Sequence, residues 1–390
     1  MIPAVMPTYA RSELTFERGE GAYLYASDGR KYLDFSSGVA VTSLGHAHPR
    51  LNAALAKQAA KLWHCSNLYQ IAEQKKLAQR LVDLTFADTV FFCNSGAEAM
   101  ECAIKLVRKH YAESGHPEKY RLIACHGSFH GRTLATLAAA GNEKYLKGFG
   151  PPAPGFDHVA FGNLNEMRAA VGKETAAILV EPVQGEGGLA TAPPEYLRGL
   201  RAIADEFGIL LVFDEVQSGM GRTGKLFAHE WAGVTPDVMA LAKGLGGGFP
   251  VGACLATERA AAGMTAGTHG STFGGNPLAM AVANGVLDVM LADGFLARVN
   301  GVAELLHRRL DELAAGYPDI IAERRGKGLL TGFRCVVPNT EMVARLRERG
   351  LLVAGAGDNV VRALPPLIID RSHVEEAVDI IESIAAQWRQ

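Results

Sequence analysis

Six short apolar segments follow one another along the middle of the chain, and most of them are separated from the next by a longer stretch with helical character. Continuous apolar runs are typical of strands buried on both faces, which requires a mainly parallel sheet covered by helices. The segments are Thr89–Cys93, Arg121–Cys125, Ala176–Pro182, Ile209–Glu215, Asp237–Lys243 and Val251–Thr257. The expected fold class is therefore α/β, with ligands bound beyond the carboxyl ends of the strands.

The flanking segments predict a smaller α/β lobe. With 390 residues the chain exceeds the roughly 250–300 that one hydrophobic core usually holds. We expect residues 1–60 to contribute to the small lobe, 61–292 to form the large ligand-binding domain and 293–390 to form the C-terminal small domain. The supporting patterns are a hairpin (Ala22–Phe35), helices (Pro49–Trp63, Ala72–Leu84, Pro277 into the 310s), then a strand (Gly328–Val337), a helix (Thr340–Arg349), two short strands and a last helix from Arg371.

Charge and composition exclude several classes of partner. Lys and Arg number 39 against 41 Asp and Glu, and they are interspersed, so no basic stripe is available for nucleic acid or anionic lipid. The six cysteines form no C-x-x-C pair, which favours free thiols over a zinc site or disulfides. The first residues lack the features of a signal peptide, and no stretch reaches the ~18 apolar residues of a membrane span. We expect a cytoplasmic enzyme for small molecules, without metal, nucleic-acid or membrane partners.

Three elements stand at the predicted carboxyl ends of strands. Asp214 ends the run ILLVFD and is a candidate ligand-facing carboxylate, although a cap or turn residue is the common alternative. Lys243 ends DVMALAK before a glycine-rich stretch and is a candidate nucleophile activated by desolvation, whereas most lysines are solvated. Asn94–Glu98 leads into a helix whose free N–H groups favour a phosphate, with simple capping by Ser95 as the alternative.

Together the three elements indicate more than any one of them. Pyridoxal phosphate needs a lysine to form an imine, an acid to keep the ring nitrogen protonated and a helix N-terminus to hold the phosphate. The protonated ring then accepts electrons from a carbanion at the substrate Cα. The residues therefore predict an enzyme that uses this cofactor.

Longer motifs surround these elements and occur in a fixed order along the chain. They are LGHAHP (Leu44–Pro49), NSGAEA (Asn94–Ala99), FHGRT (Phe129–Thr133), EPVQGEGG (Glu181–Gly188), DEVQSGMGRTG (Asp214–Gly224), LAKGLGGG (Leu241–Gly248) and STFGGNP (Ser271–Pro277). With them the chain resembles the class-III, fold-type I aminotransferases along nearly its whole length. The resemblance implies a pyridoxal 5'-phosphate enzyme in which Lys243 is the Schiff-base lysine and Asp214 the partner of the pyridine nitrogen.

Further cofactor contacts follow from the resemblance alone. Phe129 and Val216 would pack on the two faces of the ring, and Gln217 would donate to its phenolic oxygen. In this family the residue at Thr272 binds the phosphate in the neighbouring subunit's site, and Ser271 reaches the same site, which implies a homodimer. The phosphate cradle would be formed by Ser95, Gly96 and Ala97.

Substrate recognition is also implied by the resemblance. Arg132 resembles the arginine that holds the carboxylate at the far end of the substrate, and Arg362 the one that holds the α-carboxylate of glutamate. Glu186 resembles the acid that pairs with Arg362 when a substrate presents its δ-amino group. Relatives that act on ornithine carry tyrosine at the position of Val39. Valine there resembles the branch that acts on N-acetylornithine, with 2-oxoglutarate and glutamate as the second pair of substrate and product. Ornithine, succinylornithine or another ω-amino acid remains the alternative substrate.

Two rival interpretations keep other chemistry open. The segment Gly219–Lys225 matches the first seven positions of a P-loop, but position 226 is leucine, so the hydroxyl for Mg²⁺ is missing. A mutase, racemase, decarboxylase or inactive cofactor-binding protein on the same fold is the second rival. Intact Lys243 and Asp214 argue against inactivity, and Arg362 with Glu186 argues for two different amino donors.

Overall fold

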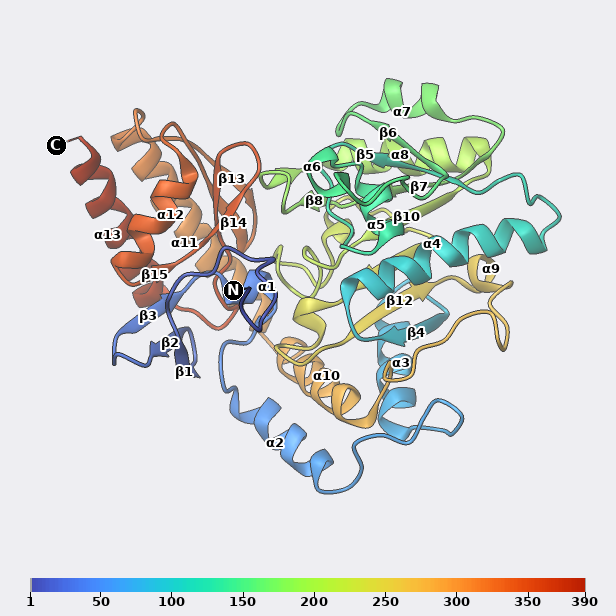
Figure 1. Cartoon of the computed structure of the whole chain (residues 1–390), viewed down its shortest axis with the longest axis horizontal. Coiled ribbons are helices and arrows are strands. Elements are labelled where there is room, and N and C mark those ends of the chain that lie inside the picture. Colours follow the sequence, from blue (N-terminus) through green and yellow to red (C-terminus); the bar gives the residue numbers. More distant parts are fainter. Residues whose placement is uncertain (1, 390) are drawn as a thin grey trace.

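The computed structural model describes residues 2–389, which form two lobes, the larger built around one sheet of seven strands (Figure 1). The strand order is β4-β12-β11-β10-β7-β5-β6, and only β12 runs antiparallel to its neighbours. The expected mainly parallel α/β architecture is confirmed. The strands are β4 (Thr89–Cys93), β5 (Arg121–Cys125), β6 (Phe156–Val159), β7 (Thr175–Val180), β10 (Leu210–Asp214), β11 (Val238–Leu241) and β12 (Gly252–Ala256).

Helices cover both faces of this sheet. Along β10, Leu210 and Val212 pack with apolar residues of α4, whereas Leu211 and Phe213 pack with those of α8. Side chains of a strand alternate between its faces, so a strand buried on both must be apolar throughout. The helices of this lobe are α4 (Gly96–Glu113), α5 (Leu134–Ala140), α6 (Glu143–Leu146), α7 (Leu164–Ala170), α8 (Pro194–Phe207) and α9 (Glu258–Ala261).

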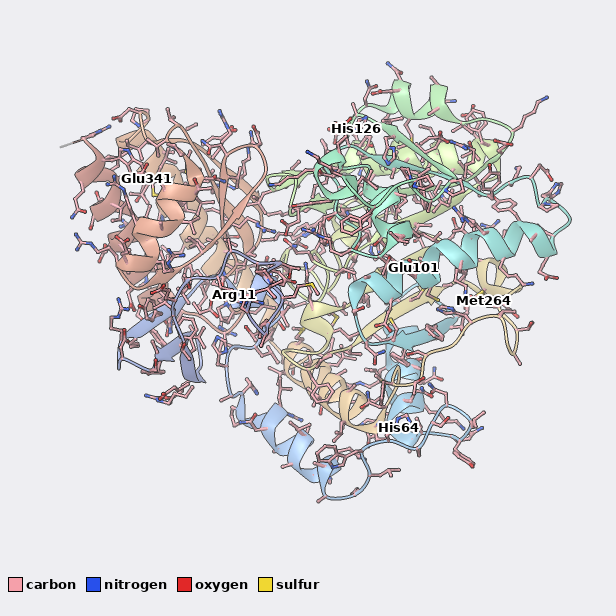
Figure 2. The ribbon with its side chains drawn as sticks, viewed as in Figure 1. Arg11, His64, Glu101, His126, Met264 and Glu341 are labelled. Atoms are coloured by element: carbon pink, nitrogen blue, oxygen red, sulfur yellow. The ribbon has the colours of Figure 1, made fainter. Side chains whose placement is uncertain are left out.

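The smaller lobe joins the two ends of the chain, and its blue N-terminal strands lie beside the orange and red C-terminal elements in Figure 1. One sheet has the order β1-β2-β3-β15 and the other β13-β14-β17-β16. Helix α12 lies on the outside of this lobe, where Figure 2 labels Glu341. The elements are β1 (Phe16–Glu20), β2 (Tyr23–Ala26), β3 (Lys31–Asp34), β13 (Ile321–Lys327), β14 (Leu330–Cys335), β15 (Leu351–Leu352), β16 (Ala354–Ala356), β17 (Val360–Ala363), α11 (Phe295–Gly316), α12 (Asn339–Glu348) and α13 (Arg371–Trp388).

Helix α3 (Ala72–Leu84) packs against β4 of the large sheet and against α10 (Pro277–Met290). The long helical stretch expected from Pro277 is two helices, because residues 291–294 break it and bend the axis by 72°. No single helix within residues 2–389 is long and apolar enough to cross a membrane, and this bent pair meets the criterion only when both halves are taken together. The remaining elements are α1 (Ser37–Ala40), α2 (Pro49–Ala59), α3 (Ala72–Leu84), α10 (Pro277–Met290), β8 (Val183–Gln184) and β9 (Ala190–Thr191).

The segment Gly219–Lys225 does not have the geometry of a P-loop. A P-loop connects a strand directly to a helix whose free N–H groups face a phosphate. Here only a short 3-10 helix, η1 (Ala228–Trp231), follows, and the Lys225 Nζ donates to the carbonyl oxygen of Glu230 at 3.1 Å. The nucleotide-binding alternative is therefore wrong.

Arg222 connects this buried segment to the small lobe through hydrogen bonds. Its Nη1 donates to the carbonyl oxygen of Leu329 at 3.3 Å and to that of Pro365 at 2.5 Å, both in the small lobe. Burial without an acidic partner among the described residues lowers the Arg222 pKa to about 9. The guanidinium thus ties the segment after β10 to the small lobe.

We expect Arg222→Ala to lower the free energy of unfolding by about 2–4 kcal/mol, because two buried carbonyl oxygens lose their donor. Urea titration monitored by circular dichroism measures the change. Arg324→Ala is the matched control: it removes an exposed pair with Asp311 at 3.0 Å and should cost less than about 1 kcal/mol. Similar small losses in both variants would contradict the role assigned to Arg222.

Candidate active site

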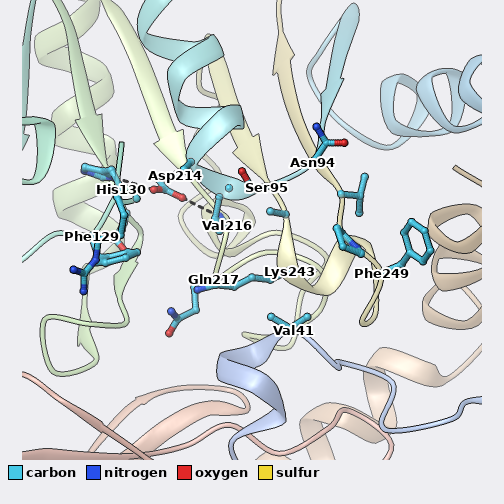
Figure 3. Close-up of a pocket in the computed structure, with 18 of the residues that line it drawn as sticks. Val41, Asn94, Ser95, Phe129, His130, Asp214, Val216, Gln217, Lys243 and Phe249 are labelled. Atoms are coloured by element: carbon cyan, nitrogen blue, oxygen red, sulfur yellow. Dashed lines mark hydrogen bonds and ion pairs between the residues drawn. The ribbon is translucent and has the colours of Figure 1, made fainter. Parts of the chain in front are cut away.

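A cavity of about 400 Å³ opens beyond the carboxyl ends of β10 and β11. It lies where the strand pattern predicts a ligand, and Figure 3 shows Asp214, Lys243 and Ser95 around it. Its lining comes from segments spread over more than two hundred residues of sequence. The lining residues are Val41, Asn94, Ser95, Gly96, Ala97, Phe129, His130, Gly131, Arg132, Glu181, Asp214, Val216, Gln217, Ala242, Lys243, Gly248, Phe249, Pro250 and Val251.

Asp214 is buried at the end of β10, and both of its oxygens are held. Oδ2 lies 2.8 Å from Nδ1 of His130, and Oδ1 accepts from the backbone N–H of Val216 at 3.0 Å (Figure 3). The other ring nitrogen of His130 is buried and has no hydrogen-bond partner in the described chain. The pair fixes the carboxylate and presents it to the cavity.

Lys243 follows β11 by two residues and faces the same cavity. Its backbone has φ +44°, a left-handed conformation that costs a non-glycine residue about 1 kcal/mol or more. Burial of the Nζ, opposed by the nearby carboxylate of Glu186 and assisted by the guanidinium of Arg362, lowers the Lys243 pKa to about 8. An amine of this kind takes up and releases protons near neutral pH and acts as a nucleophile.

The N-terminus of α4 forms one end of the cavity. Ser95 is the N-cap, and its Oγ accepts from the Glu98 N–H at 3.2 Å and donates to the Glu98 carboxylate at 2.9 Å. Ser95 therefore does cap α4, and it does so through its side-chain hydroxyl. The N–H groups of Gly96 and Ala97, in the first turn, have no hydrogen-bond acceptor within residues 2–389 and line the cavity.

Arg362 and Glu186 lie just outside the lining and connect to it through Gln217. The Arg362 Nη1 donates to Glu186 Oε1 at 2.6 Å and to Gln217 Oε1 at 3.3 Å. Arg362 is 3% exposed and Glu186 28%, so the arginine is buried while its acidic partner reaches solvent. The predicted pair is formed, with the arginine already engaged by an acid.

Ser271 and Thr272 lie away from this chain's own cavity lining. The Ser271 Oγ accepts from the backbone N–H of Gly274 at 2.9 Å and from Asn94 Nδ2 at 3.2 Å. Thr272 is exposed in the single chain. The loop is therefore held by Ser271 and presents Thr272 outward.

Val39 does not line the cavity, whereas Val41 does. Val39 packs in a cluster with Ala40, Leu189 and Val360, and its backbone is left-handed, with φ +62° and ψ +59°. All of α1 has positive φ, a strained turn for residues with side chains. Any influence of Val39 on substrates must pass through this turn, which holds Val41 at the wall.

Sequence reasoning undervalued two residues in the lining. His130 lies within the FHGRT motif without being singled out there, and in the structure it is the hydrogen-bond partner of Asp214. Glu181 begins the EPVQGEGG motif and lines the cavity, where burial and the neighbouring Asp214 raise its pKa well above the ordinary value. Glu181 follows directly on β7, so the rule that selected Asp214 would have selected it too.

Comparison with known proteins agrees with this geometry. The model of the aminotransferase class-III family matches residues 6–385. The acetylornithine aminotransferase of Brucella melitensis biotype 1 is 60% identical over 376 residues, covering 96% of this chain and 93% of that protein. The N-acetylornithine aminotransferase structure from Stenotrophomonas maltophilia K279a has a TM-score of 0.86 at 37% identity, covering 98% of each chain.

A second similar structure contains the cofactor. The ornithine aminotransferase from Toxoplasma gondii, crystallized with oxidized glutathione, has partial occupancy of PLP at its active site. It matches with a TM-score of 0.94 at 31% identity, covering 98% of this chain and 92% of that one. Class-III aminotransferases use pyridoxal 5'-phosphate.

The cavity fits this cofactor on its own geometry. A Cβ added to Gly96 would lie 2.8 Å from the Val216 side chain, so only glycine leaves this wall open beside the free N–H groups of α4. An anion therefore has a place at one end, a buried carboxylate stands at Asp214 and an amine at Lys243. Anion site, acid and amine correspond to the phosphate, ring nitrogen and aldehyde of pyridoxal phosphate.

The lowered pKa of Lys243 predicts a pH-dependent stability effect in the cofactor-free protein. Since the folded pKa of about 8 lies below the ordinary lysine pKa of 10.5, the charged amine destabilises the fold at all pH below 8. Between pH 8 and 10.5 only the unfolded chain remains charged, so stability rises with pH. The free energy of unfolding of Lys243→Met should therefore exceed that of the wild type by up to about 3 kcal/mol at pH 7, and this difference should disappear by pH 10.5.

Urea unfolding of both proteins without cofactor, at several pH values, measures this gap. Lys75→Met, an exposed position on α3, is the matched control and should open no gap at any pH. A constant difference between Lys243→Met and wild type across the pH range would disprove the assigned shift.

Proposed function

The chain belongs to the class-III aminotransferase family, and we propose that it transfers the δ-amino group of N-acetyl-L-ornithine to 2-oxoglutarate. The products of this reversible reaction, a step of arginine biosynthesis, are N-acetyl-L-glutamate 5-semialdehyde and L-glutamate. The observation that carries the proposal is the buried Arg362 paired with Glu186 beside Lys243. The identity to an acetylornithine aminotransferase over nearly the full length of both chains supports the substrate.

The proposed cofactor contacts follow the walls of the cavity. The N–H groups of Gly96 and Ala97, with Ser95, would hold the phosphate. Phe129 and Val216 would enclose the ring, and Gln217 would bond its phenolic oxygen. Thr272 of the partner subunit would complete the phosphate site.

The chain's own groups would hold and move the charges of the reaction. Pyridoxal phosphate, when bound, supplies an electron-poor ring that accepts the electron pair left on the substrate carbon after proton removal. Asp214, fixed by His130 and by the Val216 N–H, would keep the ring nitrogen protonated. The Lys243 Nζ would carry the covalent link and, with a pKa of about 8, move a proton to and from the substrate carbon.

The pair of Glu186 and Arg362 is the proposed switch between the two half-reactions. With the pair closed, as in this structure, the buried guanidinium is occupied and the site suits a substrate that presents a terminal amine. Glutamate brings an α-carboxylate, which would take over the guanidinium when Glu186 swings toward solvent. The partial exposure of Glu186 supports such a movement.

The proposed assembly is a homodimer with shared sites. Large apolar side chains are exposed on the two loops around Asn67 and Ser271, which bond to each other through the Asn67 amide. The ring of His64, labelled in Figure 2, lies 5.4 Å from that of Phe273 in the same surface. A second copy that covers this face would receive Thr272. The exposed members are Leu62, Trp63, Leu68, Tyr69 and Phe273.

Domain division and compartment belong to the same proposal. Residues 1–60 would share the small lobe with 293–390, supported by the parallel pairing of β3 with β15, and residues 61–292 would form the cofactor-binding domain. The proposed compartment is the cytoplasm. All six cysteines are unpaired, as is usual where thiols are kept reduced.

Half-reactions with candidate donors test the substrate. We expect the wild type to prefer N-acetylornithine to ornithine by roughly tenfold or more in kcat/KM. A free α-ammonium group loses its hydration in the pocket and finds no partner there, which weakens the binding of ornithine. Loss of the cofactor's visible absorption reports each reaction, and succinylornithine tests the acyl group. Lys243→Ala is the inactive control. A preference for ornithine would overturn the substrate, and retained turnover in Lys243→Ala would overturn the mechanism.

Arg362→Ala should weaken the glutamate half-reaction more than the acylornithine half-reaction. Loss of one charge-assisted partner in a buried site costs about 2–5 kcal/mol. Glutamate would lose the partner of its α-carboxylate, whereas a substrate that presents a terminal amine does not use this guanidinium. Single-turnover kinetics with each donor measure both losses. Arg325→Ala, an arginine paired with Glu323 and Asp358 outside the cavity lining, is the control. Equal losses with both donors in Arg362→Ala would rule out the switch.

A further inference from the structure

The head group of Arg132 is held in an unusual way. Its guanidinium carbon lies 3.7 Å from the ring centroid of Tyr145 and 5.6 Å from that of Phe129. Within residues 2–389 it forms neither an ion pair nor a side-chain hydrogen bond, although it lines the cavity. Among the described residues, this cation is held by aromatic faces alone.

The backbone on either side of Arg132 is fixed. Gly131 has φ +129°, and a Cβ there would lie 2.8 Å from the Cβ of Ala97, so glycine lets this turn pack directly on α4. Thr133 caps α5, and its hydroxyl donates at 2.6 Å to Glu101, which Figure 2 labels on α4. The long side chain of Arg132 is therefore the mobile part, and only its contacts can position the head group.

Tyr145 comes from a separate element, the short helix α6. Its half-buried ring stands perpendicular to that of Phe129, with the centroids 6.4 Å apart. Phe129 lines the cavity, whereas Tyr145 lies behind the lining. The two rings and the guanidinium thus form one cluster at the edge of the site.

An aromatic partner does something that an acidic partner cannot. A carboxylate binds a guanidinium in its plane, through the N–H groups at the edge, and so occupies the donors that a substrate carboxylate needs. A ring face attracts the same cation from above its plane and leaves the edge free. A guanidinium held only by rings is ordered and still unoccupied.

We propose that Tyr145 is a positioning residue that orients Arg132 for the far-end carboxylate of the substrate. The proposal rests on the proposed function, because N-acetylornithine and glutamate both carry such a carboxylate. Tyr145 touches neither substrate nor cofactor and acts through the guanidinium. Its ring face, not its hydroxyl, carries the effect.

Pairs of donors that differ in the far carboxylate test this role. N-acetylputrescine has the amine and the acetamide of N-acetylornithine but lacks its carboxylate, and L-alanine lacks the second carboxylate of L-glutamate. In Tyr145→Leu we expect kcat/KM to fall about fivefold for N-acetylornithine and for glutamate, mainly through KM. The values for N-acetylputrescine and alanine should stay within about twofold of wild type. Tyr145→Phe keeps the ring and should behave as wild type.

The outcomes separate the alternatives. For each variant, the kcat/KM of a donor with the far carboxylate is divided by that of its partner without it, both measured on the same preparation. A loss of folded protein lowers both values equally and cancels in this ratio. Equal losses for donors with and without the carboxylate would assign Tyr145 a packing role and overturn the proposal, and so would a Tyr145→Phe variant as impaired as Tyr145→Leu. If the wild type does not use N-acetylornithine, the proposed substrate fails, while glutamate and alanine still test Tyr145.

Discussion

The parallel pairing of β10 with β11 is the constraint on which the site depends. Its register places Asp214 opposite Ala240, so the acid ends one strand beside the strand that leads to Lys243. Both strands are buried on both faces, and any slip would bury the carboxylate or the amine among apolar side chains without partners. The hydrophobic core therefore sets the distance between acid and amine, and the loops only add to a pair that the sheet has already assembled.

Charge in the cavity is limited by the same burial. Asp214 has two hydrogen bonds that stabilise its carboxylate, whereas Glu181 has a single backbone donor from Phe129. Desolvation and the charge of Asp214 both raise the Glu181 pKa. Burial therefore disfavours two adjacent negative charges in the cavity, and of the two acids Asp214 has more hydrogen-bond partners.

The sequence predicted the elements whose burial is uniform and missed those whose burial is mixed. Thr89–Cys93 and Ala72–Leu84 have the bounds expected from their apolar patterns. Strand β6, at the edge of the large sheet, carries Asp157 and His158, and polar residues of this kind hide an edge strand from pattern reasoning. The pair of His130 with Asp214 spans 84 residues and has no periodicity. Only the fold brings such groups together, so the sequence indicated the acid but not its partner.

The two arginines at the site show how the means of holding a cation determines its use. Arg362 is buried and engaged by an acid that reaches solvent, so its donors become free only when Glu186 moves away. Arg132 is exposed and held by ring faces, so its donors are free at all times. An aminotransferase must accept two donors in turn, and these share a carboxylate at one end but differ at the other. A permanently open guanidinium suits the shared end, and a guanidinium gated by an acid suits the end that changes.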